Sequence, residues 1–135
     1  EVRFEAAPGD YLIRCDEKRL QQVFMNILIN ALQSTGADGS VTARLFPDGG
    51  SYVVEITDTG RGIPSGNMER VFEPFFTTRN DGSGLGLAVA GRITEEHGGR
   101  IRIESEEGRG TKVIVTLPAA GIPEEERDEQ DTDSR

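Results

Sequence analysis

The chain has 135 residues, the size of a single domain, with 35% hydrophobic and 29% charged residues. No apolar run approaches the ~18 residues of a membrane span, no signal peptide is apparent, and the single cysteine, Cys15, excludes an internal disulfide. The formal net charge of −9 and the lack of a basic stripe argue against a nucleic-acid binder, and no Cys/His spacing suits zinc. We therefore expect a cytoplasmic domain, either free or as the soluble lobe of a larger membrane protein.

The first half of the chain predicts two short strands, a helix and a hairpin. Apolar residues alternate with charged ones over residues 1–6, a Pro-Gly turn follows, and Tyr11–Cys15 reads as a second strand. Asp16 is placed to cap a helix that runs to Gly36, because apolar residues then recur at helical spacing. The residues of this stripe are Leu20, Val23, Phe24, Ile27, Leu28 and Ala31. Residues 41–46 and 52–58 predict a hairpin whose turn is the Pro-Asp-Gly-Gly cluster at 47–50.

The second half predicts a helix and a second strand pair. Residues 59–84 are irregular apart from a helical turn near Met68–Phe72, and a helix from Leu85 to His97 stops at two glycines. Residues 101–105 and 112–117 then form two strands. Residues 121–135 carry seven acidic side chains and no anchoring apolar cluster, so we expect an acidic disordered tail.

These elements do not alternate as in a parallel doubly wound sheet. The hairpins instead favour an α/β two-layer sandwich, in which a mixed, largely antiparallel sheet carries its helices on one face. The sequence shows no internal repeat.

Glycine is concentrated in one stretch, because eleven of the 17 glycines lie between Asp58 and Thr111. Five residues of this stretch, Gly-Ser-Gly-Leu-Gly at 82–86, directly precede the second helix, where free N–H groups and the helix dipole favour an anion. The motif is neither a P-loop, since the chain has no Gly-Lys pair, nor a Rossmann fingerprint. A different phosphate-binding loop and a simple hinge both remain open.

Three polar side chains are further candidates. Asn26 and Asn30 lie four residues apart at the edge of the buried face of the first helix, where amide oxygens can serve a hydrated magnesium ion. Exposed amides on a helix are also common without any ligand. Asp58 ends a strand and could accept a hydrogen bond from the exocyclic amine of adenine, or it could simply begin the Gly-Pro turn that follows.

Five short motifs occur in one order along residues 8–118: Asn-xxx-Asn-Ala from Asn26, Asp-x-Gly-x-Gly from Asp58, Glu-Pro-Phe-Phe from Glu73, Gly-x-Gly-Leu-Gly-Leu from Gly82 and Gly-x-Gly-Thr from Gly108. This series resembles the ATP-binding domain of the histidine kinase, gyrase, Hsp90 and MutL superfamily. It is most similar to the catalytic and ATP-binding domain of bacterial two-component sensor histidine kinases. The resemblance implies the Bergerat fold, with residues 1–120 as the ATP-binding catalytic domain and 121–135 as a tail.

The resemblance also assigns expected roles to individual residues. Asn30 would be the magnesium ligand and Asn26 would lie beside the phosphates. Asp58 would bind the adenine amine, helped by a water that Thr111 and the turn at Gly60 to Gly62 hold. The segments 72–76 and 82–86 would form a lid over the triphosphate; its expected nucleotide-contacting residues are Phe75, Gly82, Gly84, Leu85 and Gly86. Arg79 in the lid would stabilise charge on the transferring group, or is an ordinary surface arginine.

The implied function is a protein histidine kinase with ATP and Mg²⁺ as cofactors. Hydrolytic members of the superfamily carry a general-base glutamate at the position of Asn26, so ATP hydrolysis is expected to be slow. The acceptor histidine would belong to a dimerisation domain before residue 1, with a response regulator downstream, and not be His97. This fragment would then not autophosphorylate alone, and neither nucleic acid nor direct membrane contact is expected. The alternatives are a serine-directed kinase, a hydrolytic ATPase, or a non-catalytic ATP-binding module.

Overall fold

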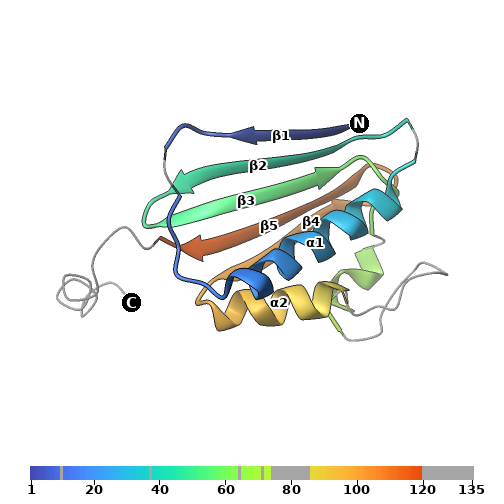
Figure 1. Cartoon of the computed structure of the whole chain (residues 1–135). Coiled ribbons are helices and arrows are strands. Elements are labelled where there is room, and N and C mark those ends of the chain that lie inside the picture. Colours follow the sequence, from blue (N-terminus) through green and yellow to red (C-terminus); the bar gives the residue numbers. More distant parts are fainter. Residues whose placement is uncertain (10, 37, 64, 71, 74–85, 120–135) are drawn as a thin grey trace, which may run out of the picture.

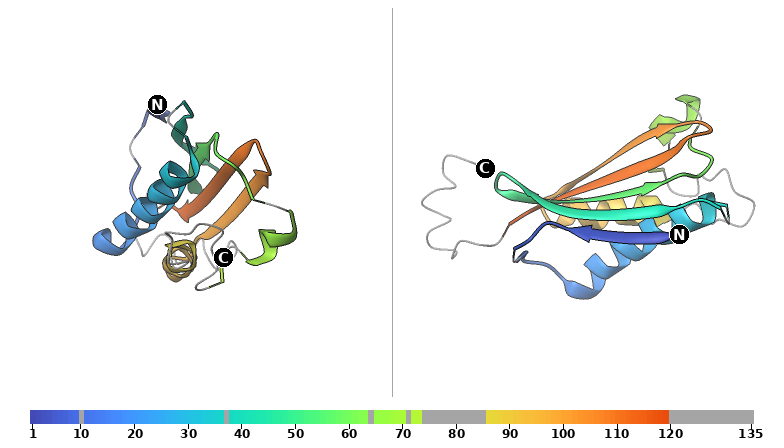
Figure 2. Two further views of the ribbon diagram at one scale, coloured as in Figure 1. Left: turned by 90° about the vertical axis from the view of Figure 1, so that its right-hand side faces the viewer. Right: turned by 90° about the horizontal axis from the view of Figure 1, so that it is seen from above.

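The computed structural model describes residues 1–9, 11–36, 38–63, 65–70, 72–73 and 86–119 (Figure 1). Within these ranges, five strands form one sheet in the order β1-β2-β3-β5-β4, and two α-helices lie side by side on one face of it (Figure 2). The elements are β1 Val2–Ala6, α1 Glu17–Ser34, β2 Val41–Asp48, β3 Ser51–Asp58, the 3-10 helix η1 Ser65–Arg70, α2 Gly86–Glu96, β4 Arg100–Glu106 and β5 Gly110–Pro118. The predicted two-layer α/β sandwich is confirmed. The predicted acidic tail, residues 121–135, lies outside the described residues.

The sheet is mixed. The edge strand β1 runs parallel to β2, whereas the β2–β3, β3–β5 and β5–β4 pairs are all antiparallel. A parallel neighbour needs a crossover, and α1 provides it between β1 and β2. The central pair β3–β5 aligns Asp58, the last residue of β3, with Thr111 near the start of β5. Two residues that are 53 positions apart in the sequence thus become cross-strand neighbours.

The core lies between the two helices and the sheet. The predicted stripe of α1 is its buried face, since Leu20, Val23, Ile27 and Ala31 are all buried. They pack with buried residues that follow the period of two on the strands and with the inner face of α2. These partners are Val41, Ile56, Ala90, Ile93, Val113, Val115 and Leu117. On the other sheet face, the Arg44 guanidinium pairs with Glu55 at 3.3 Å and lies 5.4 Å from the centre of the Phe46 ring.

Two local predictions in the first half are wrong. Tyr11–Cys15 is not a strand, although Tyr11 and Ile13 are half-buried and the residues between and after them are exposed. The Tyr11 ring packs edge-on against Tyr52, with centroids 5.0 Å apart, and the segment leads directly into α1. Its alternation therefore reflects side-chain burial without a strand partner. Residues 47 and 48 belong to β2, so only Gly49-Gly50 form the turn. The strand accepts a proline at position 47 because β1 pairs with β2 only as far as Leu45 and leaves that edge free.

The boundaries of both helices follow the expected signals. The Asp16 side chain accepts a hydrogen bond from the Arg19 N–H at 3.2 Å, which confirms it as the N-cap of α1. The helix α2 ends one residue earlier than predicted, at Glu96, and Gly98 then adopts φ +78°. The predicted turn near Met68–Phe72 is the 3-10 helix η1, shifted toward the N-terminus. No helix in the described part of the chain is both long and apolar enough to cross a membrane.

Candidate functional site

Asp58 is a buried carboxylate at the end of the central strand β3, with only 4% of its surface exposed. Its Oδ1 accepts a hydrogen bond from the Gly60 N–H at 2.8 Å. Burial raises the pKa of Asp58, and the backbone N–H groups of Gly60 and Thr111 oppose that shift only partly. No cation of the described residues contributes to this pKa. Asp58 is thus a buried acceptor whose charged form would be favoured by an additional hydrogen-bond donor.

Two glycines allow the β4–β5 hairpin to approach the end of β3 closely. Gly110 has φ +126°, and a Cβ placed on it would lie 2.0 Å from the carbonyl oxygen of Asp58. Gly62 has φ +72°, and a Cβ there would lie 2.2 Å from the carbonyl oxygen of Glu106. Both positions require glycine for two reasons, the left-handed backbone and the lack of space. The predicted Asp-x-Gly-x-Gly and Gly-x-Gly-Thr motifs therefore meet in space.

Ser105 on β4 was not singled out by the sequence, although it links these motifs. Its Oγ donates to the Gly110 carbonyl at 2.9 Å and accepts from the Ile63 N–H at 2.8 Å. The Thr111 hydroxyl lies 2.8 Å from the same oxygen, and it is the donor because the Ser105 proton is already used. Ser105 thereby fixes the orientation of the predicted nucleotide-binding Thr111. A signal was available, since Ser105 is polar at an inward position of β4 after two half-buried isoleucines.

The candidate amides line one edge of α1. Asn26 and Asn30 are half-buried and one helical turn apart. The Asn26 Nδ2 donates to the carbonyl oxygen of Gly86, the first residue of α2, at 3.2 Å. One turn beyond Asn30, the Ser34 backbone lies so close to Gly60 that a Cβ on Gly60 would be 2.4 Å from the Ser34 carbonyl oxygen.

The edge of α1 therefore runs from the start of α2 to the loop after Asp58. Figure 1 shows the C-terminal end of α1, the N-terminal end of α2 and the C-terminal end of β3 on the right-hand side of the molecule. Of the predicted site residues, the fold brings Asn26, Asn30, Asp58, Gly60, Gly62, Gly86 and Thr111 to this end.

The predicted lid is described only at its two ends. Phe75, Arg79, Gly82, Gly84 and Leu85 lie outside the described residues. Phe72 is half-buried, with its Cδ1 3.5 Å from a Cβ placed on Gly91 of α2. The roles expected for the five lid residues stay predictions.

A recess of about 330 Å³ lies at the β4–β5 hairpin. Asp58 and Thr111 line it together with charged residues of the two strands, whereas Asn26 and Asn30 do not. The recess thus includes the Asp58 side of the predicted site and not the side formed by the amides of α1. Among the described residues, no three His, Cys, Asp or Glu side chains gather as a metal cluster.

Comparison with known proteins shows to which family this chain belongs. A model of the histidine kinase-, DNA gyrase B- and HSP90-like ATPase family matches residues 15–127. The chain belongs to this family. The match includes both helices, the central strands and all five motifs, so the geometry described above is that of an ATPase-family domain.

Relatives of this ATPase-family domain are sensor kinases. The sensor histidine kinase ZraS of Escherichia coli O157:H7 is 39% identical over 118 residues, which are 87% of this chain and 26% of that protein. The chain thus spans about a quarter of the length of this relative. The solved catalytic domain of histidine kinase ThkA superposes with a TM-score of 0.79 at 33% identity, covering 88% of this chain and 78% of that one.

Two further solved structures are complexes. Full-length ShkA in complex with AMPPNP matches with a TM-score of 0.77 at 33% identity, over 89% of this chain and 26% of that one. ThkA in complex with response regulator protein TrrA matches with a TM-score of 0.75 at 30% identity, over 89% and 34%. The predicted membership of the histidine kinase group is therefore confirmed at the level of family and fold.

Proposed function

We propose that this domain binds Mg²⁺-ATP and presents the γ-phosphate to a histidine on a separate domain of a sensor histidine kinase. The observation that carries the proposal is the buried Asp58 carboxylate, held by backbone groups at the same end of the fold as the amides of α1. The sensor-kinase relatives and the nucleotide analogue bound by ShkA support it.

We assign the adenine base to Asp58. An exocyclic amine would donate to a carboxylate whose charged form is disfavoured by burial, so base binding would lower the pKa of Asp58 again. A guanine base presents a carbonyl oxygen in the corresponding position, and that oxygen would face the carboxylate without a proton between them. The site should therefore prefer adenine.

We assign the triphosphate and its metal ion to α1. The Asn30 amide oxygen is the type of hard ligand that Mg²⁺ accepts, and the ion takes most of its other ligands from phosphates and water. A preformed cluster of carboxylates is therefore not required. When bound, the ion would neutralise phosphate charge. The second N–H of Asn26, beyond the one that Gly86 accepts, is the expected phosphate donor.

The proposed reaction is phosphoryl transfer and not hydrolysis. Asn26 is an amide and cannot act as a general base on water, whereas phosphoryl transfer needs mainly positioning and charge neutralisation. His97 is not a suitable acceptor, because its Nδ1 contacts the Ile93 carbonyl and its Nε2 accepts from the Asp16 N–H. The acceptor then belongs to the dimerisation domain, and ThkA with TrrA supports a response regulator as the next phosphate acceptor.

A thermal-shift experiment tests this proposal. Millimolar AMPPNP with Mg²⁺ should raise the melting temperature of the wild-type chain by mass action on the native state. Asp58→Asn should lose the preference for AMPPNP over the guanine analogue GMPPNP, because an amide can donate to the guanine carbonyl. No shift for the wild type would overturn the proposed function. An unchanged preference in Asp58→Asn would overturn the role of Asp58.

A further inference from the structure

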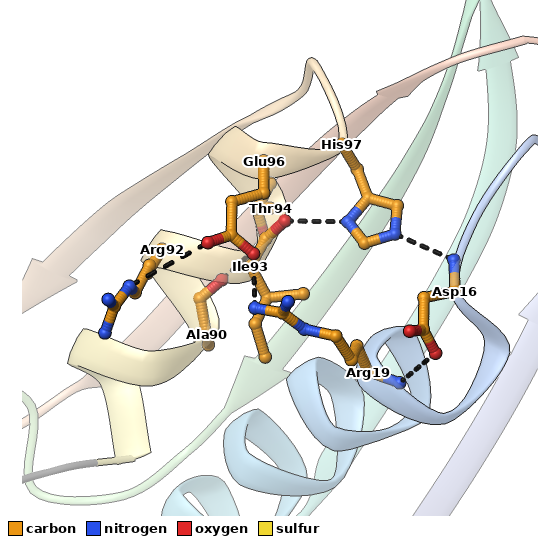
Figure 3. A network of polar contacts seen from close by, with 8 residues as sticks. All are labelled: Asp16, Arg19, Ala90, Arg92, Ile93, Thr94, Glu96 and His97. Carbon is orange, nitrogen blue, oxygen red and sulfur yellow. Dashed lines mark hydrogen bonds and ion pairs between the residues drawn. The ribbon is translucent and has the colours of Figure 1, made fainter.

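His97 connects the end of α2 to the start of α1. Its Nδ1 lies 2.8 Å from the Ile93 carbonyl oxygen on α2, and its Nε2 lies 3.0 Å from the backbone nitrogen of Asp16, which is 81 residues away. Figure 3 shows the imidazole between the two helices, with a dashed line on each side. Asp16 is the N-cap of α1, so the contact reaches the residue that begins the amide-bearing helix.

These two contacts define the protonation state of the imidazole. The Ile93 carbonyl can only accept, so Nδ1 must carry a proton. The Asp16 N–H can only donate, so Nε2 must present its lone pair. Only the neutral Nδ1–H tautomer satisfies both groups; a proton on Nε2 removes the contact with Asp16. The ring thus joins the carbonyl end of α2 to the amide end of α1.

A second contact joins the same helices at the start of α2. The Asn26 Nδ2 donates to the Gly86 carbonyl, so the start of α2 lies beside the middle of the antiparallel α1. From Asp16 to Asn26 the helix rises by about 15 Å, and from Gly86 to His97 by about 16 Å. Because these two lengths are nearly equal, the two contacts lie at the two ends of α2. Together they fix the position of α1 along the axis of α2.

Charged side chains surround the histidine contact. Arg19 of α1 forms an ion pair with Glu96 of α2, and Arg92 lies 3.9 Å from the same carboxylate (Figure 3). The Arg19–Glu96 pair is about half-exposed and the Arg92 side chain is mostly exposed, so each pair contributes little alone. The charged residues around the imidazole in Figure 3 are Asp16, the N-cap of α1, Arg19 of α1, and Arg92 and Glu96 of α2.

We propose that His97, as the neutral Nδ1–H tautomer, is a positioning residue that fixes α1 against α2 and so holds Asn26 and Asn30 in place for the nucleotide. This inference rests on the proposed function. It assigns no contact between His97 and the nucleotide; the effect travels through α1, whose N-cap the imidazole holds.

The tautomer can be measured directly, because His97 is the only histidine of the chain. Long-range ¹H–¹⁵N NMR spectra of the wild-type protein should show a protonated Nδ1 and an unprotonated Nε2 at neutral pH. The Asp16 amide should move in the same titration as the imidazole when the pH is lowered. An Nε2–H tautomer, or an Asp16 amide that ignores the imidazole titration, would overturn the inference regardless of whether the chain binds ATP.

Three substitutions separate positioning from simple stabilisation. The Oε1 of His97→Gln can replace the Nε2 acceptor, whereas the amide of His97→Asn reaches only the Ile93 side, and His97→Ala has neither contact. We expect Mg²⁺-AMPPNP affinity at neutral pH to fall by about threefold to tenfold in His97→Asn and His97→Ala, the equivalent of one neutral hydrogen bond, and to stay near wild type in His97→Gln. Glu95→Gln, an exposed change on α2, is the matched control.

Mg²⁺-AMPPNP affinity across the three His97 variants decides the positioning role. If all three His97 variants bind as the wild type does, His97 has no positioning role although the proposed function stands. If the wild type itself does not bind, the proposed function fails instead, and the NMR result still decides the contact.

Discussion

The two sides of the candidate site are built in different ways. The sheet side consists of Asp58, Gly60, Gly62, Gly110 and Thr111, and backbone atoms make most of its close contacts. The helix side consists of Asn26 and Asn30, whose amides project from a helix that is fixed by its own buried stripe. On the sheet side, the residues expected to recognise the nucleotide also pack the fold. On the helix side, Asn30 is expected to bind the ligand, whereas the buried stripe packs the fold.

This difference decides what a mutation can reveal. A Cβ added to a glycine on the sheet side displaces backbone against backbone, so fold and binding should fail together. A change at Asn30 of α1 leaves Leu20, Val23, Ile27 and Ala31 in place, so binding should fail alone. Three substitutions test this contrast.

The largest effect is expected from Gly110→Ala. A Cβ at Gly110 would lie 2.0 Å from the Asp58 carbonyl oxygen, on a backbone with φ +126°. We expect a loss of about 4 kcal/mol or more in the free energy of unfolding, or no folded protein. Gly108→Ala is the matched control, because Gly108 has φ +85° and nothing within 4 Å of its Cβ position; its loss should be about 1 kcal/mol. Equal losses in urea unfolding would contradict the close-approach argument.

An intermediate effect, on binding only, is expected from Asn30→Ala. Removing the amide oxygen should weaken Mg²⁺-dependent AMPPNP binding by about tenfold or more, while the free energy of unfolding changes by less than about 0.5 kcal/mol. Calorimetric titration with and without Mg²⁺ measures the first, and urea unfolding the second. Gln33→Ala, an exposed change on the same helix, should alter neither. Unchanged Mg²⁺-dependent binding would remove Asn30 from the metal site.

The smallest effect is expected from Asp58→Asn on stability. The folded-state pKa of Asp58 is raised by burial, so protonation stabilises the fold, and that contribution is lost as the pH rises through the raised pKa. The Asp58→Asn variant lacks this loss, so its stability relative to the wild type should increase over the same range. We expect a difference within about 1 kcal/mol at pH 7. If Asp58→Asn were instead less stable than the wild type at neutral pH and equally stable in acid, the sign assigned to the pKa shift would be wrong.

Sequence patterns predicted most of the candidate site residues but few of the contacts that hold these residues in place. Asp58, Asn26 and Asn30 could be singled out because their chemistry and local spacing are visible in the chain. The position of Ser105 on β4 gave only a hint of burial, and its role could not be predicted, because its three partners lie 5 to 42 residues away and meet only when the hairpin packs on the loop after Asp58. The error at Tyr11–Cys15 has the same origin, since alternation reports burial but not the presence of a strand partner.

The local elements could be read from the residues alone. The stripe and N-cap of α1, the two hairpins and the glycine stop of α2 follow from spacing and backbone preference, which act over a few residues. Three longer-range features emerged only from the folded chain: β1 pairs in parallel with β2, Gly110 lies against Asp58, and His97 holds Asp16. Such contacts depend on how whole elements pack, because the atoms involved come from distant parts of the chain and meet only after the core has formed.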